Sequence, residues 1–245
     1  MKAVFVLLLL FLFSALLHSN AVTERFDPAQ IALRNTSAGT LQLIGMLEER
    51  LKTDPDSYDL HWKLALACYY YGDFYARGVE ARKSWFARCR YQAQLAVDRN
   101  PDGVDGIYWL GVGYAMWANE NGIVESLINV NKIIQSMNRV IDLDPAYFDG
   151  LPWAIRAKVY AALPGLGNRE KAETDMENAL RYGKNYRAVY QVASDLYISL
   201  GDYGKAEALV QAGLSLPFDR TAEAEEKVSL RDLSNDLQIL KEKAK

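Results

Sequence analysis

Three prolines, each preceded by Asp or Asn, divide the chain at a nearly constant interval. They occur in Asp54-Pro55, Asn100-Pro101 and Asp144-Pro145, which lie 46 and 44 residues apart. Each follows a run of apolar residues at helical spacing, and a proline ends one helix and begins the next turn. This interval predicts a repeated helical unit, in which neighbouring copies bury apolar faces that one copy cannot bury alone.

The predicted helix after each proline carries an aromatic residue, then a small residue, then a tyrosine. The three sets are Trp62, Ala65 and Tyr69; Trp109, Gly111 and Tyr114; and Trp153, Ala157 and Tyr160. A fourth unit reads Tyr190, Ala193, Ser194 and Tyr197, followed by Gly201-Asp202-Tyr203-Gly204-Lys205-Ala206 and later by Pro217. Alternating β-branched residues are scarce, so we predict an all-α protein.

These units resemble the tetratricopeptide repeat (TPR) family, and the segment Gly201–Ala206 matches its turn specifically. In that family the small residue lets the second helix of a hairpin pack closely, and the aromatics fill the seam between hairpins. The resemblance implies a right-handed α-α superhelix of about four helical hairpins with a C-terminal capping helix. Ligands of such arrays usually lie on the concave surface.

The predicted organisation has four parts. Residues 1–21 form a signal peptide, 22–54 an N-terminal helical cap, 55–217 the TPR-like repeats, and 218–245 the C-terminal capping helix. The signal peptide is indicated by Lys2, an uncharged apolar run from Ala3 to Leu17, and Ser19-x-Ala21 before the cut. We therefore expect a periplasmic or secreted protein. The alternative is an N-terminal anchor that stays uncleaved.

Charge and composition argue against several classes of function. The 28 basic and 31 acidic residues give a net charge of −3, with no long basic run, which argues against a nucleic-acid partner. After residue 21 the only histidine is His61, which we interpret as a surface or capping residue. The sequence thus predicts no metal site, no cofactor and no catalytic residues.

Cys68 and Cys89 are the only cysteines, and they fall on the two facing helices of one predicted hairpin. An exported protein meets an oxidising compartment, where such a pair can form a disulfide. The alternative is two buried thiols that pack as small apolar groups.

Five residues fit the packing pattern less well than their neighbours and are the candidate ligand-binding residues. They are Trp117, Asn119, Asn129, Asn131 and Arg156. Amides and a guanidinium in apolar helices need polar partners, and Arg156 could clamp a carboxylate with two parallel hydrogen bonds. Alternatively, the asparagines cap helices or face solvent, and Arg156 pairs with Asp144 or Asp149.

A narrower resemblance appears in the middle of the chain. It is carried by Tyr108–Gly111, Asp142–Tyr147, Gly150-Leu151-Pro152 before Arg156, and Ala161–Gly165. These segments resemble the TRAP-transporter-associated TPR proteins, the T components. That resemblance implies a periplasmic, non-enzymatic protein that works with a substrate-binding protein, in some members as a homo-oligomer of three subunits. Members are often lipoproteins, whereas no cysteine follows the apolar run here.

We therefore expect an exported TPR scaffold that binds a partner protein, as an accessory subunit of a TRAP-type solute uptake system. One alternative is a periplasmic carrier of a small hydrophobic or organic-acid ligand, held between the long helices of the first two units. Another is a general scaffold for assembly of the cell envelope.

Overall fold

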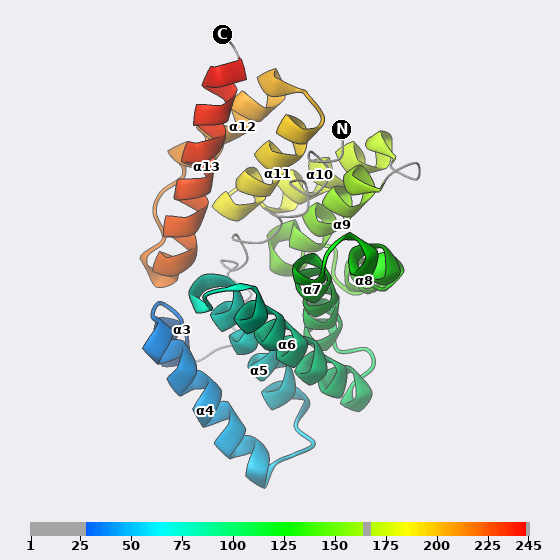
Figure 1. Ribbon diagram of the computed structural model, residues 1–245, viewed down its shortest axis with the longest axis vertical. Helices are drawn as coiled ribbons and strands as arrows, with labels where there is room; N and C mark the ends of the chain where they lie inside the picture. Colours follow the sequence, from blue (N-terminus) through cyan, green and yellow to red (C-terminus); the bar gives the residue numbers. More distant parts are fainter. Residues whose placement is uncertain (1–27, 164–167, 244–245) are drawn as a thin grey trace. The chain divides into compact units, whose positions relative to one another are not determined.

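The computed structural model describes residues 28–163 and 168–243, and these segments are helical, with no strand among them (Figure 1). The predicted all-α fold is confirmed. The predicted signal peptide lies outside the described residues, as do Pro164 and Gly165 of the segment Ala161–Gly165. Within the described part, no helix is both long enough and apolar enough to cross a membrane.

The chain forms two compact units that meet in sequence at Pro145 and Ala146. In the first unit, Pro28–Pro145, every helix packs mainly against its neighbours in sequence. Its helices are α3 (Pro28–Leu33), α4 (Ser37–Thr53), α5 (Tyr58–Tyr70), the π-helix η1 (Tyr71–Tyr75), α6 (Val79–Arg99), α7 (Val104–Asn121) and α8 (Ile123–Leu143). The pairs α5–α6 and α7–α8 are two of the predicted hairpins.

A helix ends just before each of the three prolines, as the sequence predicts. Helices α4, α6 and α8 end at Thr53, Arg99 and Leu143, and the residue after each helix donates its backbone N–H to the last turn. The proline that follows has no N–H to continue the helix. These stops set the length of each hairpin, and so the predicted periodicity follows directly from local chemistry.

The small residues predicted at the helix crossings are buried. Ala65, Ala157 and Ala193 have no exposed surface, and Gly111 is buried beside α8. Aromatic side chains fill the space around them, as the repeat pattern predicts: the rings of Tyr69 and Trp109 lie 5.4 Å apart. This contact joins the first helices of two successive hairpins.

The first hairpin contains a π-helical turn at Tyr71–Tyr75, directly after α5. Gly72 lies against Phe86 there, and a Cβ at position 72 would be 2.7 Å from that ring. The π-turn thus continues the helix beyond α5, and Gly72 lets it pack closely against α6.

The second unit is described over residues 146–163 and 168–243. Its elements are the 3₁₀ turn η2 (Tyr147–Gly150), α9 (Leu151–Ala162), α10 (Arg169–Tyr182), α11 (Arg187–Ser199), α12 (Tyr203–Ser215), the 3₁₀ turn η3 (Arg220–Ala222) and α13 (Glu223–Lys243). Pairs α9–α10 and α11–α12 are the other two predicted hairpins, and α13 packs on both α11 and α12. The boundaries predicted at 54/55 and 217/218 remain predictions.

Side-chain caps start two of these helices. Asn168 accepts a hydrogen bond from the backbone N–H of Lys171, at 2.9 Å, and Asp202 accepts one from Lys205, at 3.1 Å. Both satisfy N–H groups that the first turn of a helix leaves unpaired. Asp202 belongs to the Gly201–Ala206 turn, so one residue of that motif serves as the N-cap of α12.

Candidate functional site

The hairpin formed by α7 and α8 is the candidate site. Gly122 alone links the two helices, and its φ of 95° is a conformation that favours glycine. Farther along, Gly111 lets the helices approach closely, because a Cβ there would lie 2.7 Å from the Cβ of Ser136. The hairpin is thus fixed at its turn and at one crossing point.

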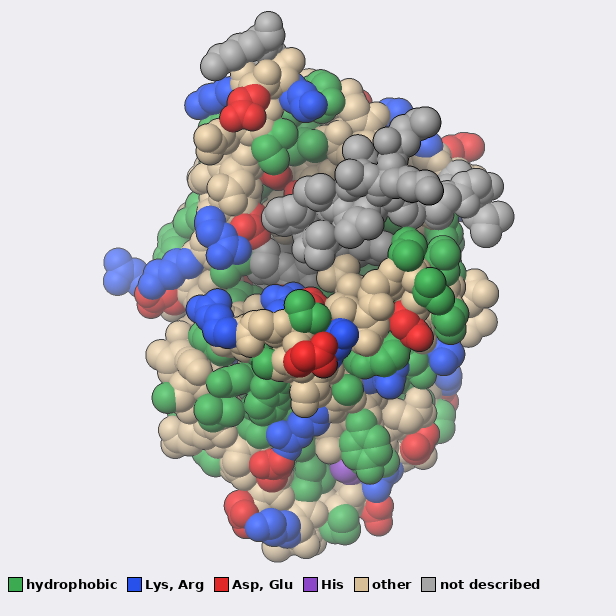
Figure 2. Space-filling view, viewed as in Figure 1, with side chains coloured by type: hydrophobic (Ala, Val, Ile, Leu, Met, Phe, Trp, Pro, Cys, Tyr) green, Lys and Arg blue, Asp and Glu red, His purple; other side chains and the backbone are tan. Residues whose placement is uncertain are grey.

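Helix α8 carries two apolar faces. One face packs into the unit through Ile133, Met137 and Val140. The other is exposed: Val124 is 65% accessible, Leu127 49% and Ile128 61%. Because these three positions follow helical spacing, they form one stripe, which we call the α8 stripe. Figure 2 shows hydrophobic side chains at the surface over the region where Figure 1 places α8.

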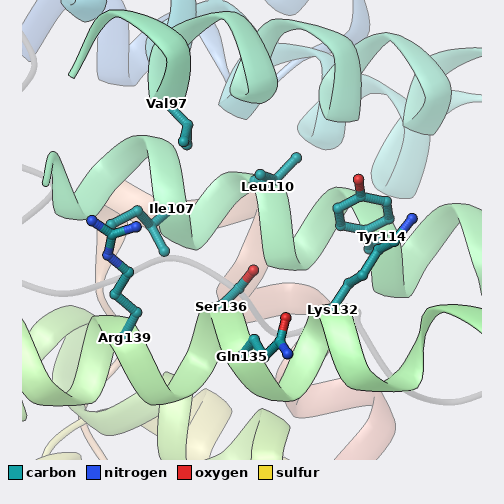
Figure 3. Close-up of a pocket in the computed structure, with 8 residues that line it drawn as sticks. All are labelled: Val97, Ile107, Leu110, Tyr114, Lys132, Gln135, Ser136 and Arg139. Atoms are coloured by element: carbon teal, nitrogen blue, oxygen red, sulfur yellow. The ribbon is translucent and has the colours of Figure 1, made fainter. Parts of the chain in front are cut away.

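An open groove of about 330 Å³ lies between α7 and α8. Its apolar side is formed by Val97 of α6 with Ile107 and Leu110 of α7 (Figure 3). Its polar side is formed by α8 residues that follow the α8 stripe in sequence. The polar set is Lys132, Gln135, Ser136 and Arg139, and Tyr114 closes one end.

The two cations of the groove differ in their partners. Arg139 donates to the carboxylate of Asp102 at 2.6 Å, and both side chains are exposed, so this pair contributes little stability. The Lys132 ammonium lies 4.8 Å from the centre of the Tyr114 ring and has no ion pair with any described residue. The groove therefore presents one uncompensated positive charge beside an apolar wall.

Two of the predicted site residues lie on the last turns of α7. Trp117 is partly buried, and the Arg90 guanidinium lies 4.3 Å from its ring centre, a cation–π contact. The Asn119 Oδ1 atom is buried and has no hydrogen-bond partner among the described residues. These contacts place Trp117 and Asn119 near the Gly122 turn, and neither lines the groove.

The two asparagines predicted on α8 have different surroundings. Asn129 is 3% exposed and donates from Nδ2 to the backbone oxygen of Glu125, at 2.8 Å, within its own helix. Asn131 is exposed. The alternative interpretation, in which these amides bond locally or face solvent, describes both positions.

Arg156 belongs to the second unit, on α9. Its Nε and Nη2 atoms donate to the two carboxylate oxygens of Asp175 on α10, each at 2.7 Å. This is the two-bond geometry predicted for a ligand carboxylate, made instead to a carboxylate of the chain itself. The five predicted residues therefore do not come together as one site within either unit.

The cysteines are free thiols, and both are fully buried. Burial raises the pKa of the Cys68 thiol well above its usual value, with a smaller contribution from Cys89. Burial also raises the pKa of Cys89. The disulfide remains a prediction for the exported protein.

His61 corrects the interpretation of a surface histidine. It is 5% exposed, with Nε2 2.9 Å from the backbone oxygen of Pro55 and Nδ1 2.7 Å from Oε1 of Gln92. The ring joins the loop before α5 to α6, and both of its nitrogens are engaged. Among the described residues no three His, Cys, Asp or Glu side chains form a metal-binding group.

Neither the α8 stripe nor Lys132 was predicted from the sequence. A signal was present, because apolar residues occupy two separate helical faces between Ile123 and Ile141, whereas a helix that packs on one side needs one. Helix α7, by contrast, is apolar because both of its sides pack against neighbouring helices.

Stacked α-helical hairpins with a small residue at each crossing define a tetratricopeptide-repeat-like protein. The chain belongs to the TRAP transporter T-component family (TAtT), whose model matches residues 89–230. It is thus a TRAP-associated helical scaffold, and this family is non-catalytic. The matched residues include α7 and α8.

A solved TPR structure has a similar fold. The thermophilic TPR protein TTC0263 of Thermus thermophilus is 18% identical, with a TM-score of 0.61 over 83% of this chain and 97% of that one. MamA is 18% identical, with a TM-score of 0.48 over 78% of this chain and 92% of that one.

Among proteins compared by sequence, an uncharacterized protein of Treponema pallidum (strain Nichols) is 34% identical over 82 residues. The match covers 32% of this chain and 25% of that protein, so it spans about a quarter of the relative's length.

Proposed function

We propose that this chain is an exported accessory subunit of a TRAP-type uptake system, and that it binds the system's substrate-binding protein through the α8 stripe. The family supports the association with the transporter. The α8 stripe supports the binding surface, because three adjacent aliphatic side chains on one helix are 49% to 65% exposed. This surface is the observation that carries the proposal.

The energy available from the α8 stripe suits a reversible complex. Full burial of one aliphatic side chain contributes about 1.5–3 kcal/mol, so covering the exposed parts of Val124, Leu127 and Ile128 contributes about 3 kcal/mol together. That is a factor of about 100 in the dissociation constant. Polar contacts around the α8 stripe must supply the rest.

The test is the affinity of the full exported chain for the TRAP substrate-binding protein proposed as its partner. The double variant L127E/I128E places two charges on the α8 stripe, and we expect the dissociation constant to rise about a hundredfold. The matched control is L41E/M46E on α4, where each wild-type side chain is 44% exposed in the same unit. The control should bind like the wild type.

Two results would contradict the proposal. One is equal binding by both double variants, which would place the contact elsewhere. The other is the absence of measurable binding by the wild-type chain, which would remove the partner itself. Circular dichroism of both variants separates a lost surface from a lost fold.

A second candidate function is favoured by the groove between α7 and α8. Its apolar wall and the uncompensated Lys132 ammonium suit a small ligand with an acidic head and an apolar body, as a carrier would hold. Native mass spectrometry of the exported chain tests this candidate. A retained small-molecule mass that is lost in K132M supports it, whereas a bare protein mass for the wild type opposes it.

A further inference from the structure

Helix α13 is joined to the second unit by a buried polar cluster. Asp236 of α13 is 6% exposed and bonds to Ser194 of α11, which is fully buried. Next to Ser194 in sequence, Asp195 accepts from the Lys158 ammonium of α9 at 3.1 Å. Asp232, 9% exposed, lies one turn before Asp236. The cluster therefore brings three helices together through charged groups that are largely removed from water.

Asp236 has little hydrogen-bond support for a negative charge, because its contact with Ser194 is shared. The Ser194 hydroxyl has one hydrogen to donate but lies within bonding distance of two acceptors, the Gln191 backbone oxygen at 2.9 Å and the Asp236 carboxyl. That single hydrogen is shared between the two acceptors, so Asp236 receives at most one donor from Ser194. A buried carboxylate with so little donor support is costly to ionise, which favours the neutral form of Asp236.

The charges of the cluster lead to the same conclusion. The charged groups that act on Asp236 are Asp195, Lys158 and Asp232, from α11, α9 and α13. Lys158 already pairs with Asp195. Burial, and then the Asp195 charge, raise the pKa of Asp236 from 3.8 to about 7. A second buried negative charge beside Asp195 would have no cation of its own.

We propose that α13 is a pH-controlled cap, which a proton on Asp236 holds against α11 and which loosens as the pH rises through neutrality. The inference does not depend on the proposed function, because α13 is separate from the α8 stripe in sequence. Loosening of α13 would expose the polar face of α11 that carries Gln191 and Ser194, so the cap would control access to that face.

Apolar contacts hold part of α13 in place at every pH, so rising pH weakens its docking without abolishing it. Leu233 and Leu240 of α13 are buried at any pH, and Leu233 packs closely against Gly213 of α12. The pKa of Asp236 is close to 3.8 when α13 is undocked and about 7 when α13 is docked. The docked state therefore holds more protons between about pH 4 and pH 7. Raising the pH across this range therefore weakens docking. From pH 6 to pH 8 the docking equilibrium should fall roughly tenfold.

The test is hydrogen–deuterium exchange of peptides from residues 223–243 in the full exported chain, from pH 5.5 to pH 8.5. The variant D236N is the reference at each pH, since its amide keeps an oxygen that accepts from Ser194 but does not titrate in this range. Dividing wild-type by D236N opening rates removes the intrinsic pH dependence of exchange. The ratio should rise roughly tenfold between pH 6 and pH 8, with little change in peptides of α9.

A flat ratio would overturn the proposal, as would an equal rise in α9, which would indicate general destabilisation. The variant S194A provides a second test that does not require D236N to fold. It removes the donor that stabilises the ionised carboxylate and lowers the pKa of Asp236, so the rise in α13 exchange should move to higher pH. An unchanged midpoint in S194A would likewise overturn the proposal.

Discussion

Asp149 occupies the most strained stretch of the described backbone. Phe148 and Asp149 have φ values of 47° and 49°, and they precede Gly150, at 81°, so that three successive residues are left-handed. Only the last is a glycine, and a left-handed non-glycine residue costs about 1 kcal/mol. Gly183 packs directly on the Asp149 backbone oxygen, which helps to hold the turn.

The same residue makes the second unit sensitive to pH. Burial raises the pKa of Asp149 from 3.8 to about 6. The folded chain therefore binds more protons than the unfolded chain between about pH 4 and pH 6, and stability falls as the pH rises through that range. Above pH 6 the loss is complete.

Replacing Asp149 with Asn should remove this loss, because an amide carries no charge and tolerates the left-handed conformation. We expect D149N to match the wild type near pH 4 and to be more stable at pH 8. The full pKa shift of about two units corresponds to about 3 kcal/mol, and solvent screening of the partly exposed carboxyl reduces the expected gain to about 1 kcal/mol. Urea unfolding across this pH range measures the difference. A constant difference at every pH would show that Asp149 does not titrate as described.

Two helical glycines give a matched test of packing. A Cβ at Gly111 would lie 2.7 Å from Ser136 Cβ, whereas a Cβ at Gly45 of α4 would have no atom within 4 Å. Alanine favours a helix over glycine by about 1 kcal/mol, so G45A should stabilise by about that amount. G111A should destabilise by about 1 kcal/mol, since α7 and α8 must separate. Thermal unfolding of both variants measures these changes in stability. Stabilisation by G111A would contradict the close approach of α7 and α8 at Gly111.

At the scale of elements, the Arg156–Asp175 pair joins α9 to α10. The Asp175 side chain is 6% exposed and that of Arg156 is 15% exposed. Because little water reaches either group, each charge is stabilised mainly by the opposite charge of its partner. Breaking a buried pair leaves an uncompensated charge, whereas replacing both members by apolar groups is close to neutral.

We therefore expect R156A to lower the free energy of unfolding by about 3 kcal/mol. The double variant R156M/D175L should recover most of that loss, because no charge is left alone in the hairpin. Chemical denaturation of both variants gives the comparison. If the double variant is as unstable as R156A, the pair is not the tie between these helices.

The hairpins could be predicted because their signals are local. Proline stops at Pro55, Pro101 and Pro145, and small residues at the crossings, act within a few residues of themselves. The partners of Arg156 and His61 could not be predicted, since they come from helices 19 and 31 residues away. Which apolar face of α8 is buried is likewise decided by tertiary packing, and so the α8 stripe was missed.

At the scale of the whole molecule, the two units carry different roles in this account. The first unit presents the α8 stripe and the groove, and the second contains the buried cluster under α13. Membership of the T-component family connects the chain with transport.

The most direct measurement is site-specific photo-crosslinking in cells. A photoreactive phenylalanine analogue replaces Leu127 in one strain and Met46 in a control strain; the two native side chains are 49% and 44% exposed. The account predicts an adduct with the TRAP substrate-binding protein from position 127 and none from position 46. Adducts of equal strength from both positions, or an adduct from position 127 with a second copy of this chain alone, would contradict it.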